Sequence, residues 1–360
     1  MYKILVLFIF SLANLYAVSL SKVEVSGDIN YEIEKPQKDG TNNSSEGESK
    51  HDIDINLRLT YPVSKASSVV LKIDDEDKKD ENGSSIDLKA DQLFVTYEQK
   101  NLSTQFGLQE ITGPFFYEKN GDGLLVLKPI KTNILAFSYY INNTYSNADE
   151  VYQIALIGET PKISYSFWYA TIEDSDQTST GVSTTDANLA ATVYQLAGYY
   201  QLGNSKMGIT HTVLDPDDQT YTAYKTRTDN KEQTQTVLYL SNEDKTIKYT
   251  LAYIITGENG GNVALDESTD SEANYSLDEV GANDVKNGKA YYIMLSKLFG
   301  TTGITIEYMN GDGTTSAEET KLTYTSYEDK DLYFYVSYDM WQKTSQSDSE
   351  KLEIGFNISF

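Results

Sequence analysis

The chain has 360 residues, and its 54 acidic against 29 basic side chains leave a net charge of −25, which disfavours binding to nucleic-acid phosphates. It contains no cysteine, so it forms no disulfide and carries no lipid on a cysteine. Hydrophobic residues make up only 39% of it while tyrosine occurs 29 times, which is unusual for a soluble core but expected of a membrane β-barrel, where only alternate residues face lipid.

Residues 1–17 have the features of a secretory signal peptide. Lys3 supplies a positive start, Ile4 to Ala13 an apolar run, and Ala17 a small residue at the expected cleavage point. The run is too short to span a bilayer as a helix, although a membrane-anchoring helix is the alternative. We therefore expect export, with residues 18–360 forming one mature domain.

From Val23 to Phe360, apolar and polar residues alternate with a period of two in segment after segment. Side chains of a strand alternate between its two faces, so each segment predicts a strand with one apolar and one polar face. The last segment is the clearest, with Leu352, Ile354 and Phe356 on one face and Lys351, Glu353 and Asn357 on the other. The expected strands, about eighteen in number, lie near 22–33, 51–61, 67–74, 90–97, 102–108, 124–128, 133–142, 150–157, 162–172, 189–202, 205–213, 233–242, 246–255, 288–298, 303–310, 320–327, 332–341 and 350–360.

The connections between these segments alternate between tight turns and longer polar loops, a rhythm typical of outer-membrane barrels and not of soluble β-sandwiches. Lipid offers no hydrogen bond to a free sheet edge, so the first and last strands should pair. The sequence thus predicts an all-β fold, a transmembrane antiparallel β-barrel of about eighteen strands, with sixteen as the alternative because the sixth segment is short. So wide a barrel encloses water. The residues expected to face lipid include Leu57, Phe167, Leu251 and Phe356.

Residues suited to catalysis or metal binding are scarce. The two histidines are His51 and His211, and His211 shares a face with Met207 and Ile209, so it should point outward near a rim. Neither lies in a pattern that predicts a Ser/His hydrolase. Acidic runs at 74–77, 215–218 and 310–313 lack the closing Glu of a calcium loop. We expect no metal, no cofactor and no enzymatic activity.

The segment 109–123, QEITGPFFYEKNGDG, is the expected constriction loop. Its aromatic residues are too apolar to lie free in water, and they would be buried if the loop folded into the barrel; packing on neighbouring loops or on another subunit is the alternative. The residues expected at the constriction are Glu110, Phe115, Phe116, Tyr117, Glu118, Lys119 and Asp122. Those expected to line the pore are Asp52, Asp54, Arg58, Lys72, Lys248 and Glu307, and the excess of acids favours cations.

Three short runs, Asp91 to Tyr97, Gly107 to Gln109 and Asn120 to Gly123, resemble the major outer membrane porins of Campylobacter-type bacteria. The resemblance departs at Asp91 and Leu108, where basic residues are common in that family. It implies an eighteen-stranded homotrimeric porin with an inward third loop, embedded in outer-membrane lipid and lipopolysaccharide. The terminal Phe360 is similar to the signal read by the outer-membrane assembly machinery.

These observations together predict a passive diffusion porin for ions and small hydrophilic solutes, with a preference for cations. A substrate-selective channel of the same fold, for peptides or amino acids, is the first alternative. A surface adhesin or receptor on the same barrel is the second. A phosphate-selective pore is disfavoured because the chain has only two arginines, Arg58 and Arg227.

Overall fold

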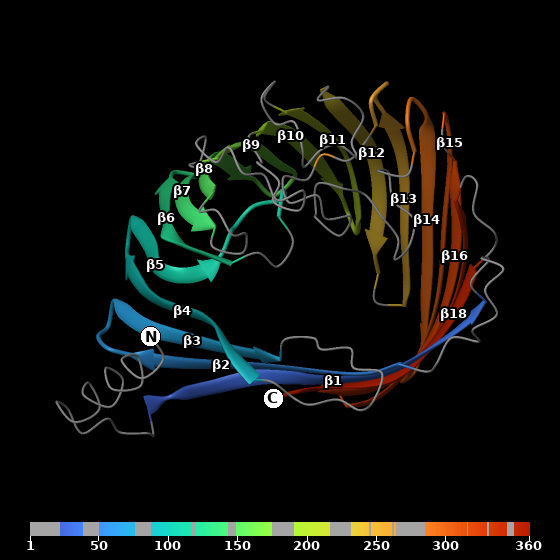
Figure 1. The fold of residues 1–360 in the computed structure, drawn as a ribbon, viewed down its shortest axis with the longest axis horizontal. Helices are drawn as coiled ribbons and strands as arrows, with labels where there is room; N and C mark the ends of the chain where they lie inside the picture. The colour runs from blue at the N-terminus through green and yellow to red at the C-terminus, as the bar shows by residue number, and fades with distance from the viewer. Residues whose placement is uncertain are drawn as a thin grey trace, which may run out of the picture.

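The computed structural model describes residues 22–38, 50–75, 88–116, 120–142, 149–174, 191–216, 232–244, 246–260, 263, 285–314, 316–329, 331–343 and 349–360. They form eighteen strands (Figure 1). The strands are β1 (Glu24–Lys38), β2 (Lys50–Pro62), β3 (Ser67–Asp75), β4 (Leu88–Gln99), β5 (Leu102–Glu110), β6 (Asn120–Ile130), β7 (Asn133–Asn142), β8 (Asp149–Glu159), β9 (Ile163–Asp174), β10 (Ala191–Leu202), β11 (Ser205–Pro216), β12 (Gln233–Glu243), β13 (Ile247–Thr256), β14 (Lys289–Phe299), β15 (Thr302–Asp312), β16 (Ala317–Asp329), β17 (Leu332–Lys343) and β18 (Ser349–Ser359).

The sheet closes on itself. Each strand pairs antiparallel with its neighbours in sequence, and β1 also pairs with β18, from Asp28 opposite Ser359 to Lys38 opposite Glu350. Two backbone hydrogen bonds extend this seam, from Gly27 N to Phe360 O at 3.0 Å and from Phe360 N to Gly27 O at 2.9 Å. Eighteen strands are therefore confirmed, and the sixteen-strand alternative is wrong.

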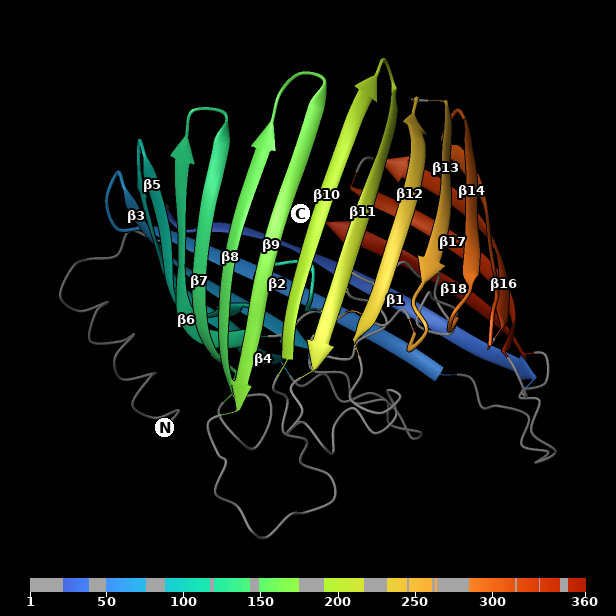
Figure 2. The same ribbon diagram turned by 90° about the horizontal axis from the view of Figure 1, so that it is seen from above.

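The connections alternate between short turns and longer loops, as predicted. Tight turns follow the even-numbered strands and gather at one edge of the barrel, hereafter the turn end; the opposite edge is the loop end (Figure 2). Left-handed backbone helps to close several turns, with φ of 63° at Gly203, 64° at Gly300 and 57° at Lys131. The sixth strand is longer than expected, because Gly121 and Gly123, which read as a turn, belong to the ladder of β6 with β7.

The outer surface of the barrel carries the large apolar side chains. Phe167, Leu251 and Ile354 are exposed there, and Phe356 contacts Tyr31 and Phe334 across the β1–β18 seam and the β17–β18 pair. Polar residues between them in sequence, such as Thr250 and Glu353, are on the inner wall and largely covered. The predicted period-two alternation is thus confirmed. Among the residues that the structure describes, no helix has the length and apolar character needed to cross a membrane.

The apolar core of the molecule lies inside the barrel, on its wall. One buried cluster, the inner cluster, comprises Ile111, Phe115, Phe116, Tyr140, Val151, Ala170, Ile172, Ala191, Val193, Leu214 and Val263, with Trp168 against it. A second cluster, the β12–β17 cluster, comprises Val237, Ala252, Ile254, Val285, Ala290, Tyr292, Met309 and Ala317, with Met294 and Trp341 against it.

Candidate transport pore

The segment after β5 turns into the barrel. Residues 111–116 leave the wall at Glu110 and extend across the interior, as the cyan chain in Figure 1 shows. Ile111 is 2% exposed, Phe115 0% and Phe116 6%, and all three belong to the inner cluster, on the inner wall of β7–β11. Burying two phenylalanines and an isoleucine holds the segment there by the hydrophobic effect.

Tyr140 on β7 is the buried support for this segment. Its ring is fully buried, its hydroxyl lies 3.4 Å from Thr112 Oγ1, and the Thr112 amide approaches it at 3.5 Å. The room for this ring comes from β6, where a Cβ at Gly123 would lie 2.4 Å from Tyr140 Cδ1 and one at Gly121 3.4 Å from Ile111 Cδ1. The Tyr140 ring therefore requires a glycine at 123, and a Cβ at Gly121 would be tight against Ile141 O and Tyr140 Cβ, each at 3.1 Å.

The residues expected at the constriction are only partly brought together. Phe115 and Phe116 lie inside, while Tyr117, Glu118 and Lys119 fall outside the described residues. Glu110 is exposed at the end of β5. Asp122 requires a correction: Gly121 and Gly123 face the interior, so Asp122 between them faces outward with Leu124, and it is exposed. The parity error arose because 120–123 was read as loop rather than strand.

Two valines between β13 and β14 also lie inside the barrel, and sequence reasoning missed them. Val263 is fully buried in the inner cluster, and Val285 is fully buried in the β12–β17 cluster. Val263 follows β13 in sequence, and Val285 precedes β14. Close to these strand ends, Asn287 N donates to Gly257 O at 2.8 Å and Thr314 N donates to Lys286 O at 2.8 Å. The sequence offered only a valine near each end of an acidic, polar stretch. By its composition, that stretch does not differ from an exposed loop.

The inner wall of β15–β18 carries an alternating row of charges. Glu307, Lys321, Asp339 and Lys351 are register partners on successive strands. Glu353 lies beside the row, 2.6 Å from Lys351 Nζ and 3.8 Å from Lys321 Nζ, and accepts a hydrogen bond from Ser337 Oγ at 2.6 Å. The side chains of Lys321, Lys351 and Glu353 are only 10–14% exposed. Their opposite charges compensate one another inside the barrel, as buried ions require.

Of this row, sequence reasoning named Glu307 for the pore wall and omitted Lys321 and Asp339. The structure adds that Glu307 accepts a hydrogen bond from the Tyr292 hydroxyl at 2.7 Å. The signal for Lys321 was present, because it alternates with the outward residues Leu322 and Tyr324.

The inner wall of β1–β4 holds most of the other residues expected to line the pore. Asp54 lies 3.4 Å from the Asn30 amide nitrogen, and Lys72 pairs with Asp74 at 3.6 Å and Asp91 at 3.7 Å. Arg58 is exposed on this wall beside Lys72. The side chain of Asp52 falls outside the described residues, and Lys248 lies apart from this group, near the turn end of β13.

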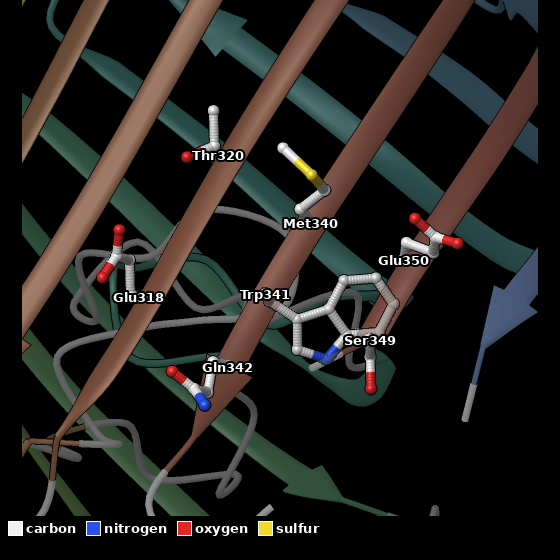
Figure 3. A pocket seen from close by; sticks show the side chains of 7 residues that line it. All are labelled: Glu318, Thr320, Met340, Trp341, Gln342, Ser349 and Glu350. Atoms are coloured by element: carbon white, nitrogen blue, oxygen red, sulfur yellow. The ribbon is translucent and has the colours of Figure 1, made fainter. Parts of the chain in front are cut away.

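The loop end of β16–β18 contains a hollow that is lined by Glu318, Thr320, Met340, Trp341, Gln342, Ser349 and Glu350 (Figure 3). Met340 is exposed on the outer surface, and Trp341 and Ser349 are register partners beside it. In Figure 3 the carboxylates of Glu318 and Glu350 lie on opposite sides of the hollow. Within the described part of the chain, no three His, Cys, Asp or Glu side chains converge as metal ligands.

No protein-family model matches the chain, and no curated protein matches it. Solved structures do. OccK3 (OpdO) of Pseudomonas aeruginosa has a TM-score of 0.72 at 10% identity, covering 96% of this chain and 97% of that one. OpdK of the same organism, an outer membrane protein solved with vanillate, has a TM-score of 0.68 at 8% identity, covering 94% and 98%. A loop-deletion mutant of OmpT, an outer membrane protein of Vibrio cholerae, has a TM-score of 0.52 at 11% identity, covering 94% and 99%.

Such low identities establish the fold alone. The chain has the eighteen-stranded barrel fold of Gram-negative outer membrane porins, and the narrower resemblance to the Campylobacter-type family depends on sequence motifs only.

Proposed function

We propose that this chain is a passive outer-membrane porin through which ions and small hydrophilic solutes diffuse, with a preference for cations. One observation carries the proposal: the infolded segment 111–116 covers one side of a closed eighteen-stranded wall, and the other side carries charged and polar residues. Barrels of this size leave a water-filled lumen that their own side chains cannot fill. A segment anchored inside narrows that lumen and leaves it open on the charged side.

The outer membrane is the location that fits the outer surface. Exposed leucine, isoleucine, phenylalanine and tyrosine side chains cover it, and only a bilayer interior makes such a surface favourable. A homotrimer in lipopolysaccharide-bearing lipid, delivered by the outer-membrane assembly machinery, is part of the proposal. Crosslinking of purified protein followed by denaturing electrophoresis tests the trimer directly.

The preference for cations follows from the acid excess along the lumen. The inner wall of β1–β4 has Asp28, Glu32, Asp54, Asp74 and Asp91 against Arg58, Lys72 and Lys89. Acids along a water-filled path raise the local concentration of cations. Screening shortens the reach of such charges from about 8 Å at physiological salt to about 3 Å at 1 M, so the preference should fall with salt and persist in part.

Planar-bilayer recording tests the function. We expect stepwise conductance, and a reversal potential across a salt gradient that indicates cation preference. Asp54→Asn removes an inward acid and should reduce this preference. The matched variant Asp122→Asn removes an outward acid and should leave it unchanged. Absence of conductance in folded protein would refute the porin, and anion preference would refute the charge argument.

A substrate-selective channel is the second candidate. OpdK shares the fold and was solved with vanillate, a small organic molecule. The half-exposed polar groups on β1–β4 give this chain side chains that could discriminate among solutes. Saturation of conductance or flux by one solute separates this reading from simple diffusion, and an adhesin or receptor would require neither.

A further inference from the structure

Arg58 stands apart from the other inward charges. It is exposed on the inner wall of β2, and its guanidinium carbon lies 5.9 Å from the centroid of the Phe94 ring, which is buried beneath it. Among the described residues no carboxylate forms an ion pair with it. Its register neighbour Lys72, in contrast, is engaged by Asp74 and Asp91. A guanidinium kept in position by a ring and left without an acid is suited to bind a carboxylate through two hydrogen bonds.

An acidic row lies next to Arg58 on the same wall. Asp28, Asn56 and Asp74 are register partners across β1, β2 and β3, two residues toward the loop end from Ser26, Arg58 and Lys72. The Asn56 amide lies between the two carboxylates: its nitrogen is 3.4 Å from Asp28 Oδ2, and the reversed amide would place a nitrogen 3.1 and 3.2 Å from the Asp74 oxygens. In either orientation the amide donates to one of the two carboxylates, and it neutralises neither.

The two rows therefore present a positive and a negative group at a defined spacing. Two residues along a strand separate the backbone positions of the two rows by about 6.6 Å, from a rise of about 3.3 Å per residue, and the Arg58 side chain extends from its row toward Phe94. An extended dipeptide separates its terminal ammonium and carboxylate by a similar length, since each residue spans about 3.3–3.6 Å. We propose that the inner wall of β1–β3 is a binding site for a zwitterionic solute of dipeptide size, with its carboxylate on Arg58 and its ammonium on Asp28 and Asp74.

The surroundings favour a zwitterion over a simple ion. An anion would gain from Arg58 but would be repelled by the chain's net charge of −25 and by Asp28, Asp54 and Asp74 close by. A cation would gain from the acids and be repelled by Arg58 and Lys72. A solute with both charges satisfies both rows. This inference rests on the proposed function, because the site can act only if the lumen conducts.

Glycylglycine and its uncharged analogue N-acetylglycinamide are the probes, because they have similar size and differ in their terminal charges. With full-length protein in liposomes, we expect glycylglycine to enter faster than N-acetylglycinamide, and to block potassium current in planar bilayers in a saturable way. Arg58→Gln should lower the ratio of the two fluxes by about tenfold, which corresponds to 1.4 kcal/mol of lost binding. Arg58→Lys should lie between, since it retains the charge without the planar fork.

Lys206→Gln is the matched control. Lys206 is another inward base over an aromatic ring, with its Nζ 4.1 Å from the centroid of Tyr199, but it lies at the turn end of β11, where its register partners Gln201 and Ser241 are uncharged. It should leave the flux ratio unchanged. Asp28→Asn tests the acidic row without touching Arg58 and should also lower the ratio.

The outcomes separate the two proposals. If folded wild-type protein does not conduct potassium, the porin itself is refuted. If potassium conductance is normal and wild-type protein passes both probes equally without block, the zwitterion site is refuted while the porin stands. If Arg58→Gln and Lys206→Gln lower the ratio of the two fluxes equally, the effect is a general one of charge, and the proposed site is overturned.

Discussion

Two halves of the same wall differ in what they present to the interior. The inner face of β7–β13 is mainly apolar or neutral and is covered by segment 111–116 and by Val263, with its described charges, Glu159, Lys206 and Lys248, near the turn end. The inner face of β14–β18 and β1–β4 carries acids and bases that alternate across neighbouring strands, although the loop end of β14–β17 also holds part of the β12–β17 cluster. The backbone ladder and the outer surface are alike in both halves, so the inward residues alone decide which half is filled and which stays wet.

The contrast explains how a barrel can be both stable and open. Apolar inward residues gain free energy when a segment covers them, so the interior of β7–β13 closes over. Charged inward residues would lose hydration under such a cover, and they remain favourable only when paired or wet. The lumen is therefore expected on the side of β14–β18 and β1–β4.

Removing a ring from the inner cluster tests the covered half and has the largest expected effect. Phe115→Ala should remove about 3–5 kcal/mol of the packing that holds segment 111–116, because the side chain is fully buried. The loosened segment should raise single-channel conductance and its noise. Phe106→Ala is the control, since Phe106 is 67% exposed on the outer surface of the same hairpin. Unchanged conductance in Phe115→Ala would contradict the constriction.

Placing a charge on either face of β13 tests the parity on which the comparison depends. Leu251 is 40% exposed on the outer surface at mid-strand, and its neighbour Thr250 faces inward. Leu251→Arg should cost about 2–4 kcal/mol of unfolding free energy in lipid, and Thr250→Arg far less. Reversible unfolding in lipid vesicles with a denaturant measures both. Equal losses would mean that the two faces are misassigned.

Removing one charge from the row tests whether pairing of opposite charges stabilises the charged half of the wall. Glu353→Gln deprives Lys321 and Lys351 of the acid that they share and should cost about 1.5–3 kcal/mol of stability. Glu318→Gln, on the outer side of β16, the strand that carries Lys321, is the control and should have little effect. If both substitutions are neutral, the row is hydrated enough that its pairing does not matter.

Opening the seam between β18 and β1 should have the smallest effect on stability. Deleting Phe360 removes its two backbone hydrogen bonds to Gly27, each contributing about 1 kcal/mol. Folded protein in the outer membrane should decrease, while the folded fraction still conducts. Phe360→Leu retains the backbone hydrogen bonds. If Phe360→Leu gives a normal amount of folded protein and the deletion a low amount, the effect is due to closure of the β1–β18 seam. An equal drop in both would favour recognition of the ring by the assembly machinery.

Much of the site was within reach of the sequence. Alternation placed Asp54, Arg58, Lys72 and Glu307 on the inner wall, because parity along a strand is a local property. The same rule failed at Asp122, where a strand was read as a loop. It gave no information on partners across strands, such as Lys321 with Glu353, since register is set by the closed ladder.

The sequence by itself determined the fold class and the outer surface and favoured eighteen strands, because period-two patterning and turn residues act over a few neighbouring positions. The tertiary structure alone decided which connections enter the barrel. Phe115 is buried by Tyr140 and by residues of four further strands, and Val263 joins them from a segment far along the chain. Only closure of the sheet brings these residues to one inner wall, and this long-range burial, which no local pattern encodes, defines the path through the barrel.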